Sequence, residues 1–448
     1  MAEPVDTLSR LLDDARAGGA TQADAVLFDT TDASASMRLG KPEGLERAES
    51  KAVGLRVFIG SQSAIVSGTD TDAVALAELA KRAVAMAKVT PADPDGTLAD
   101  AALYCKKPLD LELFDAAEPD AAWLSEQCRE AEETALAVKG ITNSEGADAG
   151  YSKSTISLAI HDGKRIAFAE SYRSSHFSIS VSVLAGEGTQ MERDYDYSST
   201  RFRNDLQDAD AIGRSAAARA LKRMNPRKVA SCKVPVVFDP RVSRSLMGAL
   251  ASAISGNAIA RGSSFLKDSL HKPVFAENIR IIDDPHIKRG LGSRPFDAEG
   301  VKNGRRAIVE GGVLQTWLLD TRTANKLKMQ TTGHASRGVA AAPSPSSSNL
   351  YMDKGVLTPG ELIEDIESGL YLTETFGMGV NTTTGDYSQG AAGFWIERGE
   401  IAYPVSEITV AGNLRDMFWR LTAANDLEFR YATNAPTLRV EAMTVAGT

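Results

Sequence analysis

The sequence predicts an α+β fold with an N-terminal α+β module, a central antiparallel meander with helices, and a strand-rich C-terminal domain. Three observations predict it. The chain has 448 residues, which is enough for two or three domains. Its apolar residues recur at helical spacing in a few segments and alternate with polar residues in many others. Stretches rich in proline and glycine separate these segments. We therefore place the domains at residues 1–90, 91–228 and 229–448.

The first ninety residues are predicted to combine two helices with short strands. Residues 6–18 place leucines at helical spacing, and residues 72–88 form a second amphipathic run. Between them, residues 23–30 and 34–39 have the composition of two separate strands. The alternation on both sides of Gly60-Ser61 predicts a hairpin. Together these elements predict a small α+β module.

The central segment is predicted to begin with a linker and to continue as a meander. Residues 89–100 contain proline, glycine and several aspartates, which is typical of a linker. A helix rich in alanine and glutamate is expected over 117–138. From 141 to 196 the pattern changes to a period of two, with a tight-turn signal at Asp162-Gly163-Lys164. A helix over 208–224 closes this segment.

The C-terminal segment is predicted to be mixed and rich in strands. Residues 243–265 form a helix of small and apolar residues, with no strong acid, base or metal ligand before Arg261. A hairpin is expected over 307–319. Thr358-Pro359-Gly360-Glu361 has the spacing of a capping box, which predicts that a helix starts there. The low-complexity residues 343–348 predict an exposed or mobile loop.

The composition argues against nucleic acid and membrane as partners. The chain carries 50 Lys and Arg against 59 Asp and Glu, a net charge of −9, which does not favour a phosphate-neutralising surface. It begins without a basic and apolar leader, and no apolar run approaches the roughly 18 residues that cross a bilayer. Cys105, Cys128 and Cys232 are too scattered for a disulfide framework or a zinc knuckle. We expect a cytoplasmic protein that binds no nucleic acid directly.

The usual motifs of hydrolases and nucleotide enzymes are missing. None of the five histidines lies three to five residues from another, as a zinc-binding helix requires. His286 with Asp283 and Asp284 is the nearest approach to a ligand cluster, and an Asp-Asp-Pro-His segment is more often a turn. The sequence contains no GxSxG elbow, phosphate loop or GxGxxG fingerprint. The chain thus lacks the parts for most independent hydrolytic or nucleotide chemistry.

Three polar loops supply candidate substrate-binding residues. The loop at 293–301 packs two acids and an arginine, and the loop at 381–388 is polar and turn-forming. The segment 261–265 can offer backbone N–H groups to an anion or a peptide carbonyl. Each loop also has a structural interpretation: an Arg–Asp pair, turn chemistry and a helix exit, respectively. The candidate residues are Arg261, Ser263, Ser264, Arg294, Asp297, Asn381 and Asp386.

Five short motifs follow one another in a specific order in the C-terminal half of the chain. They are Gly262-Ser263-Ser264-Phe265, Pro295-Phe296-Asp297-Ala298-Glu299-Gly300-Val301, Gly385-Asp386-Tyr387-Ser388-Gln389-Gly390-Ala391-Ala392-Gly393, Gly399-Glu400-Ile401-Ala402-Tyr403-Pro404-Val405 and Ala411-Gly412-Asn413-Leu414. Together they resemble the TldD/PmbA family, and specifically its PmbA (TldE) branch. The resemblance covers essentially the whole chain, and it implies a C-terminal domain of the TldD/PmbA type.

The resemblance also implies a paired system. In that family a TldD-type subunit carries an HExxxH helix and a later cysteine that hold zinc, and the PmbA-type subunit shares the fold without these ligands. The corresponding positions here fall near Met247, Gly248 and Ser252, and the last cysteine is Cys232. Zinc hydrolysis needs a metal-bound water and a carboxylate base. The resemblance therefore implies no catalytic residue, no metal ligand and no cofactor in this chain, and zinc in the TldD-type partner.

These observations lead to one leading hypothesis and two alternatives. The chain is expected to be a non-catalytic subunit that forms a heterodimer with a TldD-type paralogue. It would help to hold a small unfolded peptide by strand-edge hydrogen bonds, and the isolated chain is also expected to be able to form a homodimer. One alternative is a stand-alone adaptor or modulator of a gyrase-related system without a peptidase partner. The other is an independent enzyme with a site near His286 or Asp297.

Overall fold

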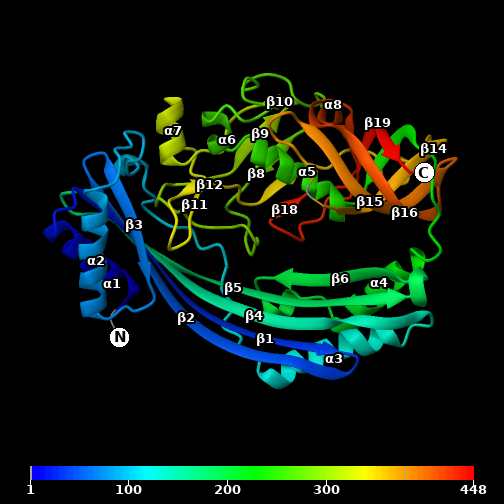
Figure 1. Ribbon diagram of the computed structural model, residues 1–448, viewed down its shortest axis with the longest axis horizontal. Coiled ribbons are helices and arrows are strands. Elements are labelled where there is room, and N and C mark those ends of the chain that lie inside the picture. Colours follow the sequence, from blue (N-terminus) through cyan, green and yellow to red (C-terminus); the bar gives the residue numbers. More distant parts are fainter. Residues whose placement is uncertain (1–2, 378, 448) are drawn as a thin grey trace.

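A long, curved sheet lies along one side of the molecule, and the C-terminal part of the chain lies across one face of it (Figure 1). The computed structural model describes residues 3–377 and 379–447. The sheet has six antiparallel strands in the order β3-β2-β1-β4-β5-β6. These strands are β1 (Gln22–Arg38), β2 (Lys41–Ile59), β3 (Gln62–Gly68), β4 (Ile141–His161), β5 (Ile166–Ala185) and β6 (Glu192–Thr200). The hairpin predicted at Gly60-Ser61 is confirmed as the β2–β3 turn.

Strand β1 runs without interruption through residues predicted as two strands, so that prediction is wrong. At its middle, Ala33 still pairs with Arg47 of β2 and with Tyr151 of β4. Neither glycine nor proline interrupts this part of β1, and both backbone edges are hydrogen-bonded, so the chain stays extended. Because β1 pairs with both β2 and β4, the segments predicted as the first and second domains share one sheet.

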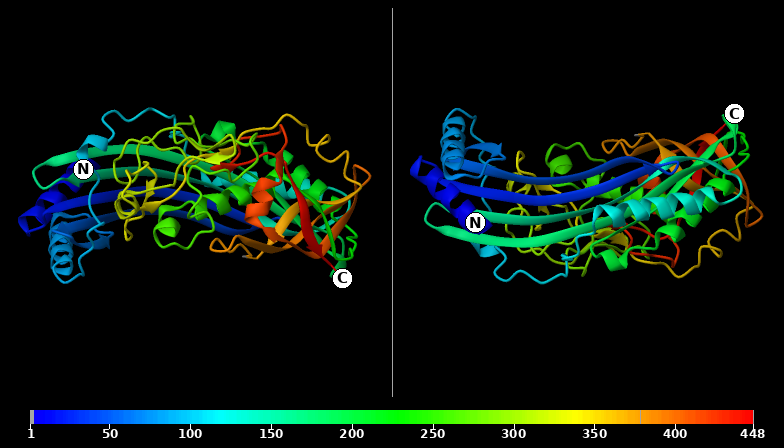
Figure 2. Two further views of the ribbon diagram at one scale, coloured as in Figure 1. Left: turned by 90° about the horizontal axis from the view of Figure 1, so that it is seen from above. Right: turned by 90° about the horizontal axis from the view of Figure 1, so that it is seen from below.

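The two faces of the long sheet have different coverings. The odd-numbered apolar residues of β1 enter two cores beneath four helices near the two ends of the sheet (Figure 2). These helices are α1 (Pro4–Ala17), α2 (Ala73–Ala87), α3 (Ala121–Leu136) and α4 (Ala209–Lys222). The even-numbered Val26 and Phe28 point to the other face, where they join a cluster with Phe296 and Val301 of the C-terminal part. The period of two therefore decides which face meets the C-terminal domain.

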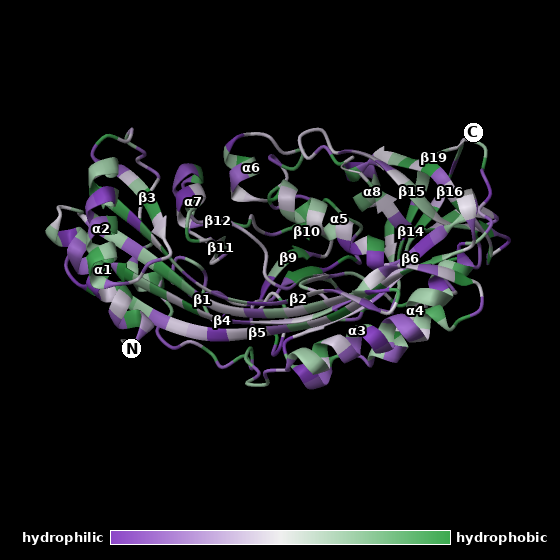
Figure 3. Cartoon of the chain, turned by 60° about the horizontal axis from the view of Figure 1, so that its bottom comes forward, coloured by the Kyte–Doolittle hydropathy of each residue, from purple (hydrophilic) through white to green (hydrophobic). Residues whose placement is uncertain are grey.

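The C-terminal part is rich in strands, as predicted. Its main sheet has the order β16-β15-β14-β7-β19-β17, and a further pairing of β16 with β19 closes the sheet on itself. These strands are β7 (Cys232–Phe238), β14 (Ser368–Phe376), β15 (Asp386–Glu397), β16 (Glu400–Asn413), β17 (Leu421–Ala423) and β19 (Leu438–Ala446). The residues that line its interior form one large apolar core. Figure 3 shows the apolar colouring inside this domain.

Shorter elements complete the C-terminal part. A five-stranded sheet has the order β10-β9-β8-β13-β18, and β11 pairs with β12. These strands are β8 (Ile281–Asp283), β9 (Arg306–Glu310), β10 (Val313–Leu314), β11 (Ala335–Ser336), β12 (Ser344–Pro345), β13 (Leu350–Met352) and β18 (Thr433–Asn434). The helices are α5 (Pro240–Ala253), α6 (Gly256–Ala260), α7 (Thr321–Leu327) and α8 (Leu414–Trp419), with 3-10 turns at Ala101–Leu103, Gly188–Gln190 and Arg203–Asp205. No helix among the described residues has the length and apolar character to cross a membrane.

The single helix predicted over 243–265 is wrong in its length. The structure divides it into α5 and α6, because Ser255 adopts an extended conformation and pairs with Leu318. The N–H of Gly256 donates to the carbonyl of Leu318 at 2.8 Å. A side chain at Gly256 would place its Cβ 2.4 Å from Oγ1 of Thr323, so only glycine allows this close approach. A tertiary contact, which local helical spacing does not report, therefore ends α5.

Two further local predictions fail for similar reasons. The capping box forms, with the hydroxyl of Thr358 donating to Glu361 at 2.9 Å, but a series of turns follows it instead of an α-helix. Its apolar residues Leu362 and Ile366 pack against the sheet, and the chain then enters β14. The segment 343–348 is not simply an exposed loop, since it contains β12 and ends in a buried serine.

Candidate functional site

Helix α5, in which the sequence resemblance locates the expected ligand positions, forms part of the C-terminal core. The carboxylate of Asp239 caps it by accepting from the N–H of Arg241 at 2.9 Å. Pro240 follows in the first turn, where a missing N–H has no intrahelical partner to lose. One face of the helix buries Leu246 and Leu250, both 0% exposed. The helix is therefore held by its apolar face.

The three residues that the resemblance sets near the expected ligand positions have no side chain of the kind that binds zinc. Met247 is 0% exposed within the core, whereas Gly248 and Ser252 lie on the exposed face of α5. None of the three offers the imidazole, thiolate or carboxylate that zinc sites use. Within residues 3–377 and 379–447, no group of three or more His, Cys, Asp and Glu side chains is placed to hold a metal ion. No step of zinc chemistry follows from this helix.

The cluster suggested by the Asp-Asp-Pro-His segment does not assemble. Asp283 lies 3.3 Å from Nε2 of His334 rather than beside His286. The ring of His286 is 2.8 Å from Oδ1 of Asn303, and its backbone N–H donates to Asp284 at 2.9 Å. Each histidine therefore has its own hydrogen-bond partner. This segment forms the turn that its sequence favours.

Two of the three predicted polar loops lie together. The backbone N–H of Phe265 donates to the carbonyl of Thr382 at 2.9 Å, which places residues 261–265 beside residues 381–388. The guanidinium of Arg415 donates to the carbonyl of Phe265 and holds the same segment from the start of α8. Sequence spacing alone, with more than a hundred residues between the loops, did not indicate this contact.

The predicted residues of segment 261–265 make helix-exit contacts. The hydroxyl of Ser264 is buried and donates to the carbonyl of Ala253 at 2.6 Å. The hydroxyl of Ser263 donates to the carbonyl of Ala258 at 3.4 Å, and Arg261 is exposed. These contacts satisfy carbonyl groups at the ends of α5 and α6. They engage both serine hydroxyls within the chain.

The predicted residues of the 381–388 loop make turn contacts. Oδ1 of Asn381 accepts from the N–H of Thr383 at 2.9 Å. The carboxylate of Asp386 accepts from the hydroxyl of Thr384 at 2.6 Å and from Nδ2 of Asn413 at 3.2 Å. The Thr384 hydroxyl and then Asn413 lower the pKa of Asp386, because they stabilise its ionised form. These contacts are those of a hydrogen-bonded turn.

Arg294 and Asp297 lie elsewhere, where the C-terminal part meets the long sheet. Oδ1 of Asp297 accepts from the N–H groups of Glu299 and Val301, both at 2.9 Å, and Oδ2 accepts from the N–H of Ala335 at 3.1 Å. Arg294 does not bind this carboxylate through a hydrogen bond. It donates instead to the carbonyls of Ala335 and Ser346, both at 3.1 Å. Asp297 thus stabilises the turn of its own loop, and Arg294 binds the backbone of the neighbouring segments at Ala335 and Ser346.

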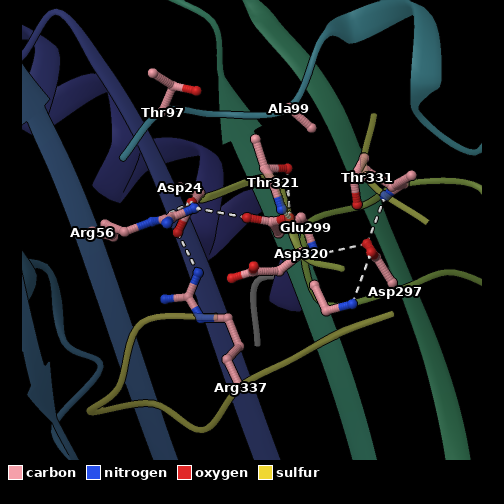
Figure 4. A network of polar contacts seen from close by, with 12 residues as sticks. Asp24, Arg56, Thr97, Ala99, Asp297, Glu299, Asp320, Thr321, Thr331 and Arg337 are labelled. Atoms are coloured by element: carbon pink, nitrogen blue, oxygen red, sulfur yellow. Dashed lines mark hydrogen bonds and ion pairs between the residues drawn. The ribbon is translucent and has the colours of Figure 1, made fainter. Parts of the chain in front are cut away.

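A buried charge network next to this loop joins the two parts of the molecule (Figure 4). Asp24 of β1 accepts from Nε of Arg56 of β2 at 2.8 Å and from Nη1 of Arg337. Nη2 of Arg56 lies 3.9 Å from Glu299, whose carboxylate accepts from the N–H of Thr321 at 2.8 Å. The side chains of Asp24, Arg56, Glu299 and Arg337 are all at most 7% exposed. The sequence analysis singled out the loop that contains Glu299 but missed Asp24, Arg56 and Arg337.

Burial and neighbouring charges set the ionisation of this network. Burial alone would raise the pKa of Asp24, but Arg337 and Arg56 together hold that pKa below its usual value. Burial raises the pKa of Glu299, and the charge of nearby Asp297 raises it further. Burial also raises the pKa of Asp297, against the opposing hydrogen bonds from backbone N–H groups. Asp24, which binds Arg56 and Arg337, is therefore ionised. Glu299 and Asp297 hold their protons more strongly than an exposed carboxyl group does.

A cavity of about 180 Å³ opens beside the network. The long sheet supplies its apolar floor, and loops of the C-terminal part supply its polar wall. Its lining residues are Val26, Phe28, Ile156, Leu158, Tyr172, Arg294, Phe296, Asp297, Ala298, Ser336 and Arg337. We call it the Arg294–Arg337 cavity.

Comparisons with known proteins place this fold in a family. Three models of PmbA/TldA metallopeptidase domains match in order: domain 1 at residues 23–87, the central domain at 108–224 and the C-terminal domain at 231–447. The chain belongs to the PmbA/TldD family. It is 38% identical to metalloprotease PmbA of Escherichia coli O157:H7 over 96% of this chain and 93% of that protein. It is 37% identical to a metalloprotease PmbA homologue of Haemophilus influenzae over 95% and 92%, respectively.

Solved structures agree with this assignment. A Bacteroides thetaiotaomicron protein, solved as a candidate modulator of DNA gyrase, has a TM-score of 0.91 and 28% identity, with 100% of each chain covered. TldE from Thermococcus kodakarensis has a TM-score of 0.86 and 18% identity, with 98% of this chain and 100% of that chain covered. The second likeness shows the fold alone. The predicted fold class and family resemblance are both confirmed.

Proposed function

We propose that this PmbA-type chain is a non-catalytic subunit of a zinc peptidase complex whose metal and general base come from a TldD-type paralogue. The observation that supports the proposal is the composition of α5, which carries methionine, glycine and serine where the resemblance sets the family's ligand positions. Water activation requires a bound metal and a nearby base, and these residues supply neither. We place this heterodimer in the cytoplasm, acting on small unfolded peptides.

The proposed role of this chain is to shape the enclosed space and hold an extended peptide. Strands β3 and β6 are the two edges of the long sheet, and an extended peptide can pair with such an edge through backbone hydrogen bonds. On α5, Gly248 and Ser252 are exposed and small, so the helix of a partner can approach closely. Both features support a role that needs a second subunit.

The test is reconstitution from purified chains. The isolated chain is expected to bind no stoichiometric zinc after chelation and dialysis, and to leave an unfolded peptide intact. Addition of the TldD-type paralogue is expected to give peptide cleavage that exceeds the activity of the paralogue alone. Cleavage by the isolated, dialysed chain contradicts the proposal. Recovery of gyrase, without any TldD-type protein, in a pull-down from the native cytoplasm favours the adaptor hypothesis instead.

A further inference from the structure

A cluster of basic residues at the end of α4 is divided between internal contacts and a cavity. The cluster consists of Arg219, Lys222, Arg223, Arg227 and Lys228. Arg223 is buried and binds Glu374 through Nη1. Cζ of Arg227 lies 4.3 Å from the ring centroid of Tyr403, and Nζ of Lys228 lies 2.9 Å from a glutamate of β16. Three members of the cluster therefore have partners within the chain.

The other two members, Arg219 and Lys222, line a cavity of about 540 Å³ between α4 and the sheet of β14, β15 and β16 (Figure 1). We call it the Arg219–Lys222 cavity. The two residues are three positions apart on α4, so they lie on one face of the helix. Lys222 is exposed and forms no ion pair or hydrogen bond with any residue that the structure describes. The side chain of Arg219 is 31% exposed, and its Nη2 lies 3.7 Å from Asp196, which is too long for a hydrogen bond. An anion from solvent can therefore reach both cations.

The carboxylates of the cavity wall are already bound to other groups. Asp194 accepts from Nη1 of Arg241 at 2.9 Å and from Nη1 of Arg223 at 3.4 Å. Asp239 accepts from the backbone N–H of Arg241 at 2.9 Å and from the hydroxyl of Tyr371 at 3.0 Å. The lining residues include three cations and these two carboxylates, a formal charge of +1. The lysine on the α4 side is the cation without a carboxylate partner, so its charge remains free to bind a ligand.

The facing wall is an apolar row on the outer side of the C-terminal sheet. Tyr371 of β14 pairs with Phe394 of β15, which pairs in turn with Pro404 of β16. Residues directly opposite one another share a face of a sheet, so these three side chains form one cross-strand row. Leu370, next to Tyr371 in β14, is 0% exposed in the core, so the row lies on the other face. Ile401, which is 49% exposed, also lines the cavity. The cavity therefore joins an apolar, partly aromatic wall to a cationic one.

Size and charge limit what this cavity can bind. A volume of about 540 Å³ lies within the range of small-molecule sites, and it accommodates an aromatic ring with a short acidic chain. A dianion such as phosphate would bring two negative charges close to Asp194 and Asp239, so a singly charged carboxylate is favoured.

We propose that the Arg219–Lys222 cavity binds a carboxylate attached to an aromatic ring, which is either the carboxyl-terminal aromatic residue of a peptide or a free aryl acid. The carboxylate binds Nζ of Lys222 and the guanidinium of Arg219, and the ring packs on the row formed by Tyr371, Phe394 and Pro404. Because all lining residues belong to this chain, the site works without a partner subunit, and its test is independent of the proposed peptidase complex.

The test is a ligand-binding titration of the full chain by calorimetry or saturation-transfer NMR. 3-Phenylpropanoate is expected to bind. 3-Phenylpropanamide, which has the same shape without the charge, and propanoate, which has the charge without the ring, are each expected to bind at least tenfold more weakly. The tripeptide Gly-Gly-Phe distinguishes the two sources of the carboxylate. Its binding assigns the site to peptide termini, and its failure beside binding of 3-phenylpropanoate assigns the site to free aryl acids. If 3-phenylpropanoate does not bind, or binds no more tightly than the amide or propanoate, the proposal is wrong.

Variants locate the binding in this cavity. Lys222→Met keeps an unbranched side chain, removes the charge, and is expected to weaken 3-phenylpropanoate about tenfold. Lys228→Met is the matched control, because Lys228 is an exposed lysine of the same basic cluster that binds Glu407 at 2.9 Å and does not line the cavity.

A second pair of variants changes the charge of the opposite wall at Ile401, where 49% exposure allows a polar side chain. Ile401→Asp is expected to abolish binding by repelling the carboxylate, whereas Ile401→Lys is expected to bind at least as tightly as the wild type. If Lys222→Met and Ile401→Asp bind as the wild type does, or if either matched variant is weakened as much as its partner, the anion does not bind here.

Discussion

Substitution of Gly54 by alanine tests how tightly the C-terminal part is fitted to the long sheet. Gly54 lies in β2, where an alanine Cβ would stand 2.1 Å from the carbonyl oxygen of Val339. Ordinary contact begins at about 3.4 Å, so the segment around Val339 must retreat by roughly 1.3 Å. Overpacking of this kind costs about 1–3 kcal/mol. Because Arg337 lies two residues before Val339, the shift also strains its buried contact with Asp24.

Gly54→Ala is therefore expected to lower the free energy of unfolding by about 2 kcal/mol. The loss is larger if the Arg337–Asp24 ion pair is also broken. The measurement is urea denaturation, with hydrogen exchange followed in residues 335–340. Gly248→Ala is the matched control, because its added Cβ meets nothing within 4 Å and lies in a helix, where alanine is favoured by about 0.5–1 kcal/mol. If Gly54→Ala unfolds at the same urea concentration as the wild type and leaves exchange at 335–340 unchanged, the fit between the two parts is looser than the contact distances indicate.

Three other predictions concern single groups. Burial raises the pKa of Glu299, so the folded chain binds this proton more strongly than the unfolded chain does. The proton therefore stabilises the fold. This stabilisation is complete below the pKa of the unfolded chain and is lost as the pH rises through the pKa of the folded chain. Glu299→Gln should therefore gain stability relative to the wild type between pH 5 and pH 9 in urea denaturation, and a gain at acidic pH instead contradicts the assignment. Tyr387→Phe removes a buried hydroxyl without a hydrogen-bond partner and should leave the melting temperature unchanged or raise it, whereas a loss above about 1 kcal/mol would reveal a hidden partner. Leu246→Ala, at a fully buried position of α5, should cost about 2–5 kcal/mol in the same assay, and a smaller loss would mean that the helix is not anchored by this face.

Local pattern was sufficient for elements that the chain forms with its neighbours in sequence. The helix predicted over 72–88 is α2, and the alternation around Gly60-Ser61 is a hairpin. Local pattern failed where a distant segment decides the outcome. Leu318 ends α5 at Ser255, and β4 keeps the middle of β1 extended. Such contacts join residues far apart in the chain, and periodicity within a window of ten or fifteen residues contains no trace of them.

The candidate site shows the same division. The sequence motifs identified Arg294 and Asp297 as members of an unusual loop, and that loop does line a cavity. The neighbouring charge network was missed because Asp24 and Arg56 stand within the apolar stretches 23–28 and 52–59 of their strands. One signal in the sequence could have indicated the buried charge. Asp24 is two residues before the buried Val26, so the two side chains lie on the same face of the strand. Such a charge must be paired across the interface, since burial without a partner is costly.

The packing of α5 makes a metal site difficult to introduce at Met247. Met247 is 0% exposed and surrounded by the apolar core, so a histidine there would bury a polar ring in a site shaped for a flexible thioether. Gly248 and Ser252 are exposed positions of the same helix. Replacing Met247 by histidine is therefore expected to destabilise the core, because its position is fully buried among apolar side chains.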